Sequence, residues 1–171
     1  MNPKTREESV TTRNERTRNK LGDFRKTYLA ISLPDNFDRE LWEKVSILSA
    51  CVDTTGTSGK AVYSLTVPAR YCNYTGNVHG GAVATILDGL TNCCTAIVSR
   101  NGFWDYGGVT RSFSINYIRP VEQNREVMVY CEIVHASSRT ITIHAVMKRT
   151  EDDKVLAMCT QEMVMIVKPK L

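Results

Sequence analysis

The residue types best suited to chemistry gather in one short stretch of the chain, residues 73–88. His79, Gly80 and Gly81 follow a turn-rich segment and begin an apolar run that carries one carboxylate, Asp88. A helix start presents free backbone N–H groups and a positive dipole end, so it can hold a developing negative charge. An aspartate among apolar residues is costly to bury unless it is paired or used. The stretch therefore predicts an electrophile-binding helix start together with a nucleophile or base.

The glycines have one clear physical reason, whereas His79 and Asp88 each have a structural interpretation beside the chemical one. Gly80 and Gly81 lack side chains, so a ligand can approach their amide N–H groups closely. His79 is either a packing or capping histidine or a hydrogen-bond donor to a carbonyl oxygen. Asp88 is either a buried carboxylate held by hydrogen bonds or a nucleophile or general base. The spacing alone leaves both choices open.

The distance between the helix start and the carboxylate constrains how they act together. Asp88 lies eight residues after Gly80, which is about 12 Å along a helix that rises 1.5 Å per residue. It therefore cannot act on a group held at the start of its own helix. A second copy of the chain, with its helix antiparallel to the first, brings the two together, so we expect a site shared between subunits.

Hydrophobic periodicity predicts an α+β order of two strands, one long helix and four strands. Apolar residues at helical spacing predict the long helix over residues 80–99, and Arg100-Asn101-Gly102 ends it. Alternating patterns predict strands over residues 45–52, 60–68, 108–118, 126–136, 140–149 and 154–167. A short helix around Leu41 and Trp42, capped by Asp35 or Asp38, precedes them. One apolar helix cannot cover itself, so we expect a curved antiparallel sheet wrapped around it.

The long helix also carries a row of polar residues opposite its apolar positions. Thr85, Asp88, Asn92 and Thr95 fall at offsets of 0, 3, 7 and 10 residues. A helix buried against a sheet should not carry such a row unless that side meets something polar. A partner subunit, a site and water are the candidates.

The bulk composition is that of an ordinary globular domain. A chain of 171 residues predicts one domain with a real core. No apolar run approaches the roughly 20 residues of a membrane helix, and the N-terminus has no apolar core of a secretory signal. The six cysteines have no CxxC spacing, so we expect reduced, buried thiols in an intracellular protein and no metal site. His135 and His144 lie in alternating strand patterns and are expected to be structural.

The positive charge is concentrated at the N-terminus. The net charge of +4 resides in residues 1–26, which hold eight basic and four acidic residues. Residues 1–35 are therefore interpreted as a basic, flexible or loosely helical arm, and residues 36–171 as the folded domain. The Arg and Thr content of the arm is similar to a mitochondrial presequence, but its acidic residues argue against one. It lacks aromatic residues at a nucleic-acid-binding spacing, so we expect a solvated tail and no nucleic-acid partner.

A set of residues across the second half of the chain resembles a known family. Asn73, His79-Gly80-Gly81 and Asp88 are followed by Val109-Thr110 and by Ile115-Asn116-Tyr117-Ile118-x-Pro120. This pattern resembles the hotdog-fold acyl-CoA thioesterases, in particular their PaaI-like branch, over residues 41–168. The resemblance implies the hotdog fold, which agrees with the predicted element order, and it leaves the N-terminal arm outside.

The resemblance also implies roles for individual residues. Asp88 matches the catalytic carboxylate, which activates water or attacks the thioester carbonyl. Gly80 and Gly81 match the turn whose backbone N–H polarises the thioester oxygen. His79 matches the motif histidine that polarises or positions the thioester, and Asn73 matches an asparagine that orients groups in the site.

Further residues of the expected site come from the helix and the next strand. Thr110 falls where close relatives often have a serine that holds the attacking water, so it keeps the hydroxyl and adds a methyl group. An apolar acyl pocket is expected to include Val83 and Leu87. The phosphates of CoA should prefer cations near the mouth of the site, for which Arg111 and Arg119 are candidates.

Together these features predict an acyl-CoA thioesterase that acts as a homodimer or homotetramer and needs no metal or redox cofactor. A non-catalytic hotdog subunit that binds acyl-CoA or acts as a scaffold is the main alternative, and a hydratase or dehydratase is the third. The expected location is intracellular, either cytoplasmic or mitochondrial. The ending Pro169-Lys170-Leu171 is only loosely similar to a peroxisomal signal.

Overall fold

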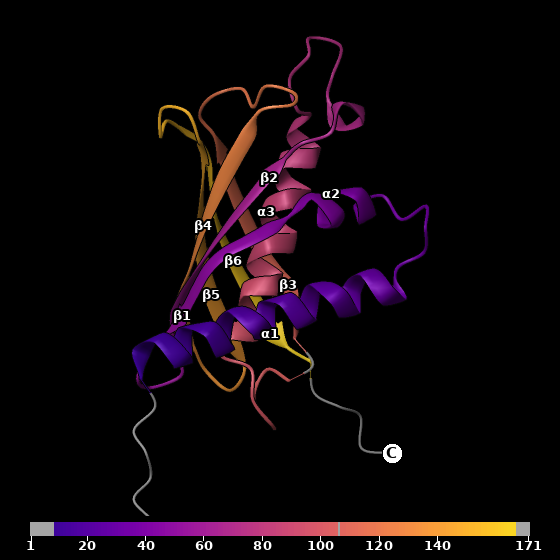
Figure 1. Cartoon of the computed structure of the whole chain (residues 1–171). Helices are drawn as coiled ribbons and strands as arrows, with labels where there is room; N and C mark the ends of the chain where they lie inside the picture. Colours follow the sequence, from indigo (N-terminus) through magenta and orange to yellow (C-terminus); the bar gives the residue numbers. More distant parts are fainter. Residues whose placement is uncertain (1–8, 106, 167–171) are drawn as a thin grey trace, which may run out of the picture.

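A six-stranded antiparallel sheet packs against one central helix. The computed structural model describes residues 9–105 and 107–166, so the first residues of the predicted arm and the C-terminal tripeptide lie outside it. The strands are β1 (Ser46–Val52), β2 (Gly59–Thr66), β3 (Gly108–Tyr117), β4 (Glu126–Ala136), β5 (Thr140–Arg149) and β6 (Val155–Met165). Their order in the sheet is β1-β2-β4-β5-β6-β3, with every neighbouring pair antiparallel. The central helix α3 (Gly80–Cys94) lies along one face of this sheet (Figure 1).

The predicted architecture is therefore confirmed, with small shifts at the ends of elements. The strands β4 and β5 have the predicted bounds. The central helix ends earlier than predicted, because the 3-10 turn η2 (Thr95–Ile97) replaces its last residues. A second 3-10 turn, η1 (Ala69–Tyr71), follows β2. The short helix α2 (Arg39–Lys44) begins after Asp38, but the Asp38 side chain makes no capping bond, which corrects the expected cap.

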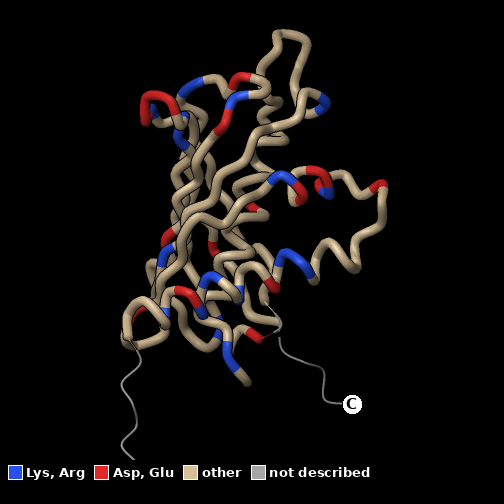
Figure 2. Tube along the Cα trace, in the orientation of Figure 1, with Lys and Arg blue, Asp and Glu red and all other residues tan. Residues whose placement is uncertain are grey.

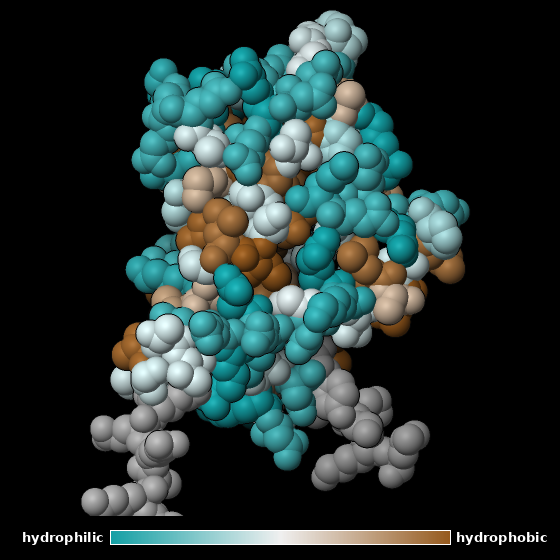
Figure 3. Space-filling view, in the orientation of Figure 1, coloured by the Kyte–Doolittle hydropathy of each residue, from teal (hydrophilic) through white to brown (hydrophobic). Residues whose placement is uncertain are grey.

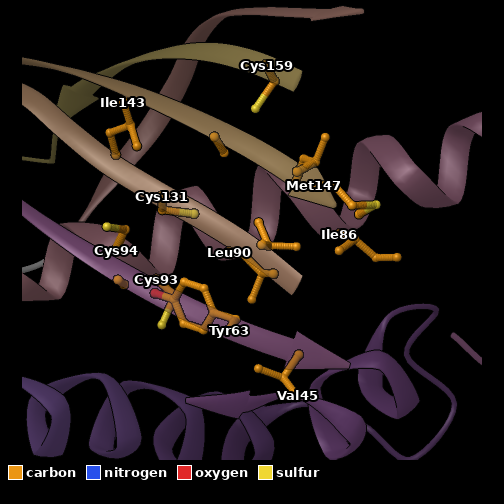
Figure 4. Close-up of a cluster of buried hydrophobic side chains, with 14 of the residues drawn as sticks. Val45, Tyr63, Ile86, Leu90, Cys93, Cys94, Cys131, Ile143, Met147 and Cys159 are labelled. Atoms are coloured by element: carbon orange, nitrogen blue, oxygen red, sulfur yellow. The ribbon is translucent and has the colours of Figure 1, made fainter. Parts of the chain in front are cut away.

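The core lies between α3 and the inward face of the sheet. Alternate residues of β4, such as Val129 and Ile133, are buried, and the same holds on β5 for Ile143 and Met147. This alternation follows from the two-residue period of a strand, which sends successive side chains to opposite faces. Figure 4 shows Met147 of β5 close to Ile86 of α3 within this core.

Several cysteines belong to this core. All six cysteines are free thiols, and four of them are buried: Cys93, Cys94, Cys131 and Cys159. Burial raises the pKa of Cys93 to about 12 and that of Cys159 to about 11. These two thiols therefore stay protonated at neutral pH. Because the thiolate is the reactive form, they act as small apolar side chains, as expected from the sequence.

The N-terminal segment differs from the expectation. Val10–Ile31 form the helix α1, capped by the Ser9 side chain, and this helix crosses below β1 and α3 (Figure 1). The flexible arm predicted over residues 1–35 therefore does not describe residues 10–31. α1 carries six basic residues and two acidic ones, Glu15 and Asp23, which stand among the basic residues along the helix (Figure 2).

Specific contacts hold α1 against the domain. Leu21 is fully buried, and the rings of Phe24 and Tyr28 pack against Trp42 of α2. Arg25 donates from Nε to the Trp42 carbonyl (2.7 Å), and Lys20 donates to the Ser99 carbonyl (2.9 Å). These contacts join α1 to the domain at several points along its length.

Replacing Leu21 by alanine should therefore lower the free energy of unfolding. Removal of a buried leucine side chain typically costs about 2 to 4 kcal/mol, through lost burial and the cavity left behind. The Leu33→Ala variant is the matched control, because Leu33 is 65% exposed. Urea unfolding of both variants measures the difference, and equal midpoints would show that α1 does not contribute to the folded core.

The strand β3 forms one edge of the sheet. Within the described residues β3 pairs with β6 alone, and most residues of β3 are exposed. Val109, Tyr117 and the following Ile118 are 58%, 54% and 44% exposed. Apolar surface is also visible over β1 and around the loop between α1 and α2 (Figure 3). An exposed strand edge with apolar side chains can pair with another chain.

Candidate functional site

His79 occupies the N-cap of α3 with its side chain turned onto the helix start. Its backbone is extended (φ −60°, ψ 138°), and its Nδ1 accepts a hydrogen bond from Gly81 N–H at 3.0 Å. A ring nitrogen that accepts cannot carry a proton, so the neutral ring carries its proton on Nε2. The His79 side chain is exposed. It can therefore donate a hydrogen bond from Nε2 to a group outside the chain.

The two glycines that follow have different reasons to be glycine. A side chain on Gly81 would place its Cβ 3.1 Å from His79 Nδ1 and crowd the capping bond. Gly80 is the first residue of the helix, and its N–H has no acceptor among the described residues. The expectation that both amides are open to a ligand is therefore corrected, because only Gly80 N–H is free.

Tyr117 of β3 lies beside Gly80, the residue whose N–H is free. Tyr117 Oη donates to the Gly80 carbonyl oxygen at 3.0 Å. A Cβ on Gly80 would lie 3.6 Å from the Tyr117 ring, which is ordinary contact. The carbonyl of Gly80 and the N–H of Gly81 belong to one peptide unit, so Tyr117 and His79 hold opposite ends of the same group. The sequence predicted no separate role for Tyr117, which belongs to the motif that resembles the family.

The Asp88 carboxylate forms a second centre farther along α3. Thr110 of β3 donates from Oγ1 to Asp88 Oδ1 at 2.9 Å. Gln161 of β6 donates from Nε2 to the same oxygen at 2.6 Å and to Thr110 Oγ1 at 2.9 Å. The structure thus brings Thr110 to Asp88, whereas Gln161 had no role in the sequence argument. Its signal was available, because it is a polar residue at a position of β6 where the alternation places apolar side chains inward.

The row of polar residues on α3 has a simpler explanation than the sequence allowed. Thr85 Oγ1 donates to Gly81 O at 3.0 Å, and Thr95 Oγ1 donates to Asn92 O at 2.7 Å. These hydroxyls bond to their own helix backbone, as threonines in helices often do. Asp88 is the member of the row that bonds to other elements.

Asn73 shapes the loop before the helix. Its Oδ1 accepts bonds from the backbone N–H groups of Thr75 and Asn77, at 3.0 and 3.3 Å, and from the Thr75 hydroxyl. This is the geometry of an Asx turn, and Gly76 completes it with φ +77°. The amide oxygen is therefore committed to the loop, which leaves Nδ2 as the part of Asn73 that can face a ligand.

Two grooves flank the start of α3. The first, here called the β3 groove, has a volume of about 430 Å³ and is lined by residues that include Asn73, Gly80, Val83, Tyr117 and Arg119. The second, here called the η1 groove, has a volume of about 510 Å³ and is lined by residues that include Phe37, Arg70, Tyr71, His79, Gly81 and Thr85. Gly80 and His79 therefore face different grooves.

The other residues that were predicted to bind substrate lie in three different places: the β3 groove, the core and the surface. Val83 lies in the β3 groove, but Leu87 is fully buried in the core and lines neither groove. The expectation that Leu87 lines an acyl pocket is therefore not met. Arg119 borders the β3 groove and donates to the Val155 carbonyl at 2.8 Å. Arg111 is exposed on β3.

The site residues of one chain thus form two separate groups. Asn73, His79 and Gly80 surround the start of α3, and Asp88 with Thr110 and Gln161 lies about 12 Å farther along the same helix. We call these the amide half-site and the carboxylate half-site.

Comparisons with known proteins find thioesterases among the proteins similar to this chain. Residues 75–156 match the model of the thioesterase superfamily. The chain is 28% identical to mouse acyl-coenzyme A thioesterase 13 over 98 residues, 57% of this chain and 62% of that protein. The human protein of the same name is 24% identical over 111 residues, 65% of this chain and 71% of that protein. The match thus spans less than two thirds of the mouse relative.

Solved structures extend the likeness to nearly the whole chain. Mouse thioesterase superfamily member 2 has a TM-score of 0.69 at 20% identity, covering 86% of this chain and 96% of that one. The PaaI protein from the phenylacetic acid degradation operon of Escherichia coli has a TM-score of 0.67 at 16% identity, covering 88% and 96%. A protein of Streptococcus mutans bound to acetyl CoA has a TM-score of 0.61 at 21% identity, covering 82% and 96%. These likenesses confirm the predicted hotdog fold.

Proposed function

We propose that this protein is an acyl-CoA thioesterase that hydrolyses fatty or aryl acyl-CoA to the free acid and CoA. The match of residues 75–156 to the thioesterase superfamily model supports this proposal. The observation that carries the proposal is the carboxylate half-site, in which Asp88 is held by hydroxyl and amide donors. The names of the mouse and human relatives support the substrate class, and so does the acetyl CoA bound to the Streptococcus mutans protein.

The carboxylate half-site supplies the attacking water. Thr110 donates its proton to Asp88 Oδ1 and accepts from Gln161, so one lone pair of its oxygen remains to accept from water. Asp88 Oδ2 has no partner among the described residues and takes the other water proton as attack begins. Direct attack by the carboxylate is the other route open to Asp88.

The amide half-site receives the electrophile. The water oxygen bonds to the thioester carbonyl carbon, and the carbonyl oxygen becomes an oxyanion that Gly80 N–H stabilises. His79 Nε2–H is a second donor at the same helix start, on the side of the η1 groove. The carbon–sulfur bond then breaks, CoA leaves as a thiolate that takes up a proton, and the acid remains. These steps need no metal or redox cofactor.

The two half-sites meet only if two chains pair. About 12 Å separate them on one helix, and the open edge of β3 with its exposed apolar residues supports a second copy at that edge. The assembly is then a homodimer, or a homotetramer built from two such dimers. Arg111 and Arg119 are proposed contacts for the phosphates of CoA, and Val83 for the acyl group.

Hydrolysis of an acyl-CoA panel tests the activity directly. The panel runs from short to long fatty acyl groups and includes an aryl acyl group, with released thiol as the readout. We expect turnover of at least one member. Tight binding without release of CoA from any member would instead favour a non-catalytic subunit.

Mixed dimers test the sharing of the site. Co-expression of an Asp88→Asn chain with a Gly80→Pro chain, carrying different tags, yields dimers in which one site keeps both functional halves. Random pairing should restore about a quarter of wild-type activity, because half of the dimers are mixed and each has one intact site. Activity that stays at the level of the single variants would place both halves within one chain.

No helix within the described residues has the length and apolar character needed to cross a membrane. From the sequence we propose the cytoplasm or the mitochondrion as the compartment.

A further inference from the structure

Gln161 is the least expected residue of the carboxylate half-site. It lies on β6 between Cys159 and Met163, whose side chains are also buried, and its own side chain is 0% exposed. Its Nε2 makes two hydrogen bonds, whereas its Oε1 is buried without a partner among the described residues. A buried acceptor without a partner destabilises the folded state. Core packing alone therefore favours an apolar residue of similar shape here, and the amide needs another reason.

The orientation of the amide follows from the charge of its neighbour. Only 2.6 Å separate Gln161 Nε2 from Asp88 Oδ1. The reversed amide would bring its oxygen to that distance from a carboxylate oxygen, and the two would repel each other. The donor must therefore face an ionised Asp88, and the unpartnered oxygen faces away from it.

This arrangement distinguishes the two oxygens of Asp88. Oδ1 receives one donor from Thr110 and one from Gln161, while Oδ2 receives none among the described residues. The second hydrogen bond of Gln161, to Thr110 Oγ1, leaves the threonine proton directed at Asp88. One buried amide thus sets both the rotation of the carboxylate and the direction of the hydroxyl.

We propose that Gln161 is a positioning residue that holds Asp88 Oδ2 and the free lone pair of Thr110 toward the attacking water. The inference rests on the proposed thioesterase function. It assigns to this strand residue a role that neither its burial nor its place in the sheet requires.

The Gln161→Met variant removes both donors while keeping the length of the side chain. We expect kcat to fall about 10- to 100-fold, because a small misplacement of a catalytic group is costly, while KM changes little. The urea midpoint should be equal or higher, because the unpartnered acceptor is gone. The Gln123→Met variant is the matched control, because Gln123 is exposed.

The Gln161→Glu variant gives a readout that a purely structural role would not change. Two carboxyl groups this close share a proton, and the proton resides on the introduced group, because that group is fully buried and Asp88 is only partly so. While the introduced carboxyl holds this proton, it donates to Asp88 as the amide does. As pH rises the shared proton leaves and two like charges face each other. The ratio of variant to wild-type kcat should therefore fall with increasing pH.

The outcomes separate this inference from the proposed function. Wild-type protein that hydrolyses no acyl-CoA contradicts the function itself. Wild-type turnover, together with an unchanged kcat for Gln161→Met and a flat pH ratio for Gln161→Glu, contradicts only the positioning role. If Gln161→Met does not fold, the pH ratio of Gln161→Glu decides.

Discussion

Exchange of Asp88 for asparagine should lower kcat for acyl-CoA hydrolysis by about 10²- to 10⁴-fold, the usual contribution of a positioned acid–base group. Asparagine has the same shape, but it can neither take a proton from water nor attack the thioester. Gln161 and Thr110 both donate to Asp88 Oδ1, and the amide oxygen of asparagine can accept the same bonds. Steady-state release of CoA by the variant and the wild type measures the effect.

The control for this exchange is Asp23→Asn. Asp23 lies on α1 with its side chain 74% exposed and pairs only with Lys26 in the described contacts. It makes the same chemical change far from the site, and its activity should match the wild type. If Asp88→Asn keeps wild-type kcat, the carboxylate is structural and the catalytic assignment fails.

Replacement of Gly80 by proline should lower kcat by about 10²- to 10³-fold, which is the cost of one lost oxyanion donor. Proline has no backbone N–H, so the substitution removes the donor itself. The fold should tolerate it for three reasons. Gly80 is the first residue of α3, a position that proline favours. His79 before it is already extended, as a residue preceding proline must be. The Gly80 N–H forms no bond that would be lost among the described residues.

The Gly80→Ala variant separates the donor from the space around it. Alanine keeps the N–H and adds only a Cβ, 3.6 Å from the Tyr117 ring. We expect Gly80→Ala to retain much more activity than Gly80→Pro, while both unfold at urea concentrations near that of the wild type. Equal losses in the two variants would mean that crowding, and not the missing N–H, reduces the rate.

Most of the fold could be predicted because its signals are local. The alternation in β4 and β5, with turn residues at their ends, located both strands to the residue. The start of α3 was equally clear, because a histidine and two glycines precede a long apolar pattern. Each of these signals depends on neighbours within a few positions, which is the range over which backbone geometry imposes its period.

The helix α1 could not be predicted in the same way. Few of its residues are apolar. Phe24 and Tyr28 pack against Trp42 and Leu21 is buried in the core, so their role depends on other elements. Most of the stability of a helix comes from the packing of one face onto a partner. From the sequence alone, a segment rich in charged residues is therefore interpreted as a flexible arm, because the surface that it packs against is not known.

The chain by itself determined the order of the elements, the helix start at His79-Gly80-Gly81 and the single carboxylate that follows it. The spacing also determined that these groups lie too far apart to act on one bond within one chain. Only the tertiary structure decided that Gly81 N–H is used by His79 while Gly80 N–H is free. It also decided that Gln161 reaches Asp88, 73 positions away along the chain. Side-chain hydrogen bonds depend on angles and distances of a few ångströms, and between remote segments these arise only when β3 and β6 pair beside α3.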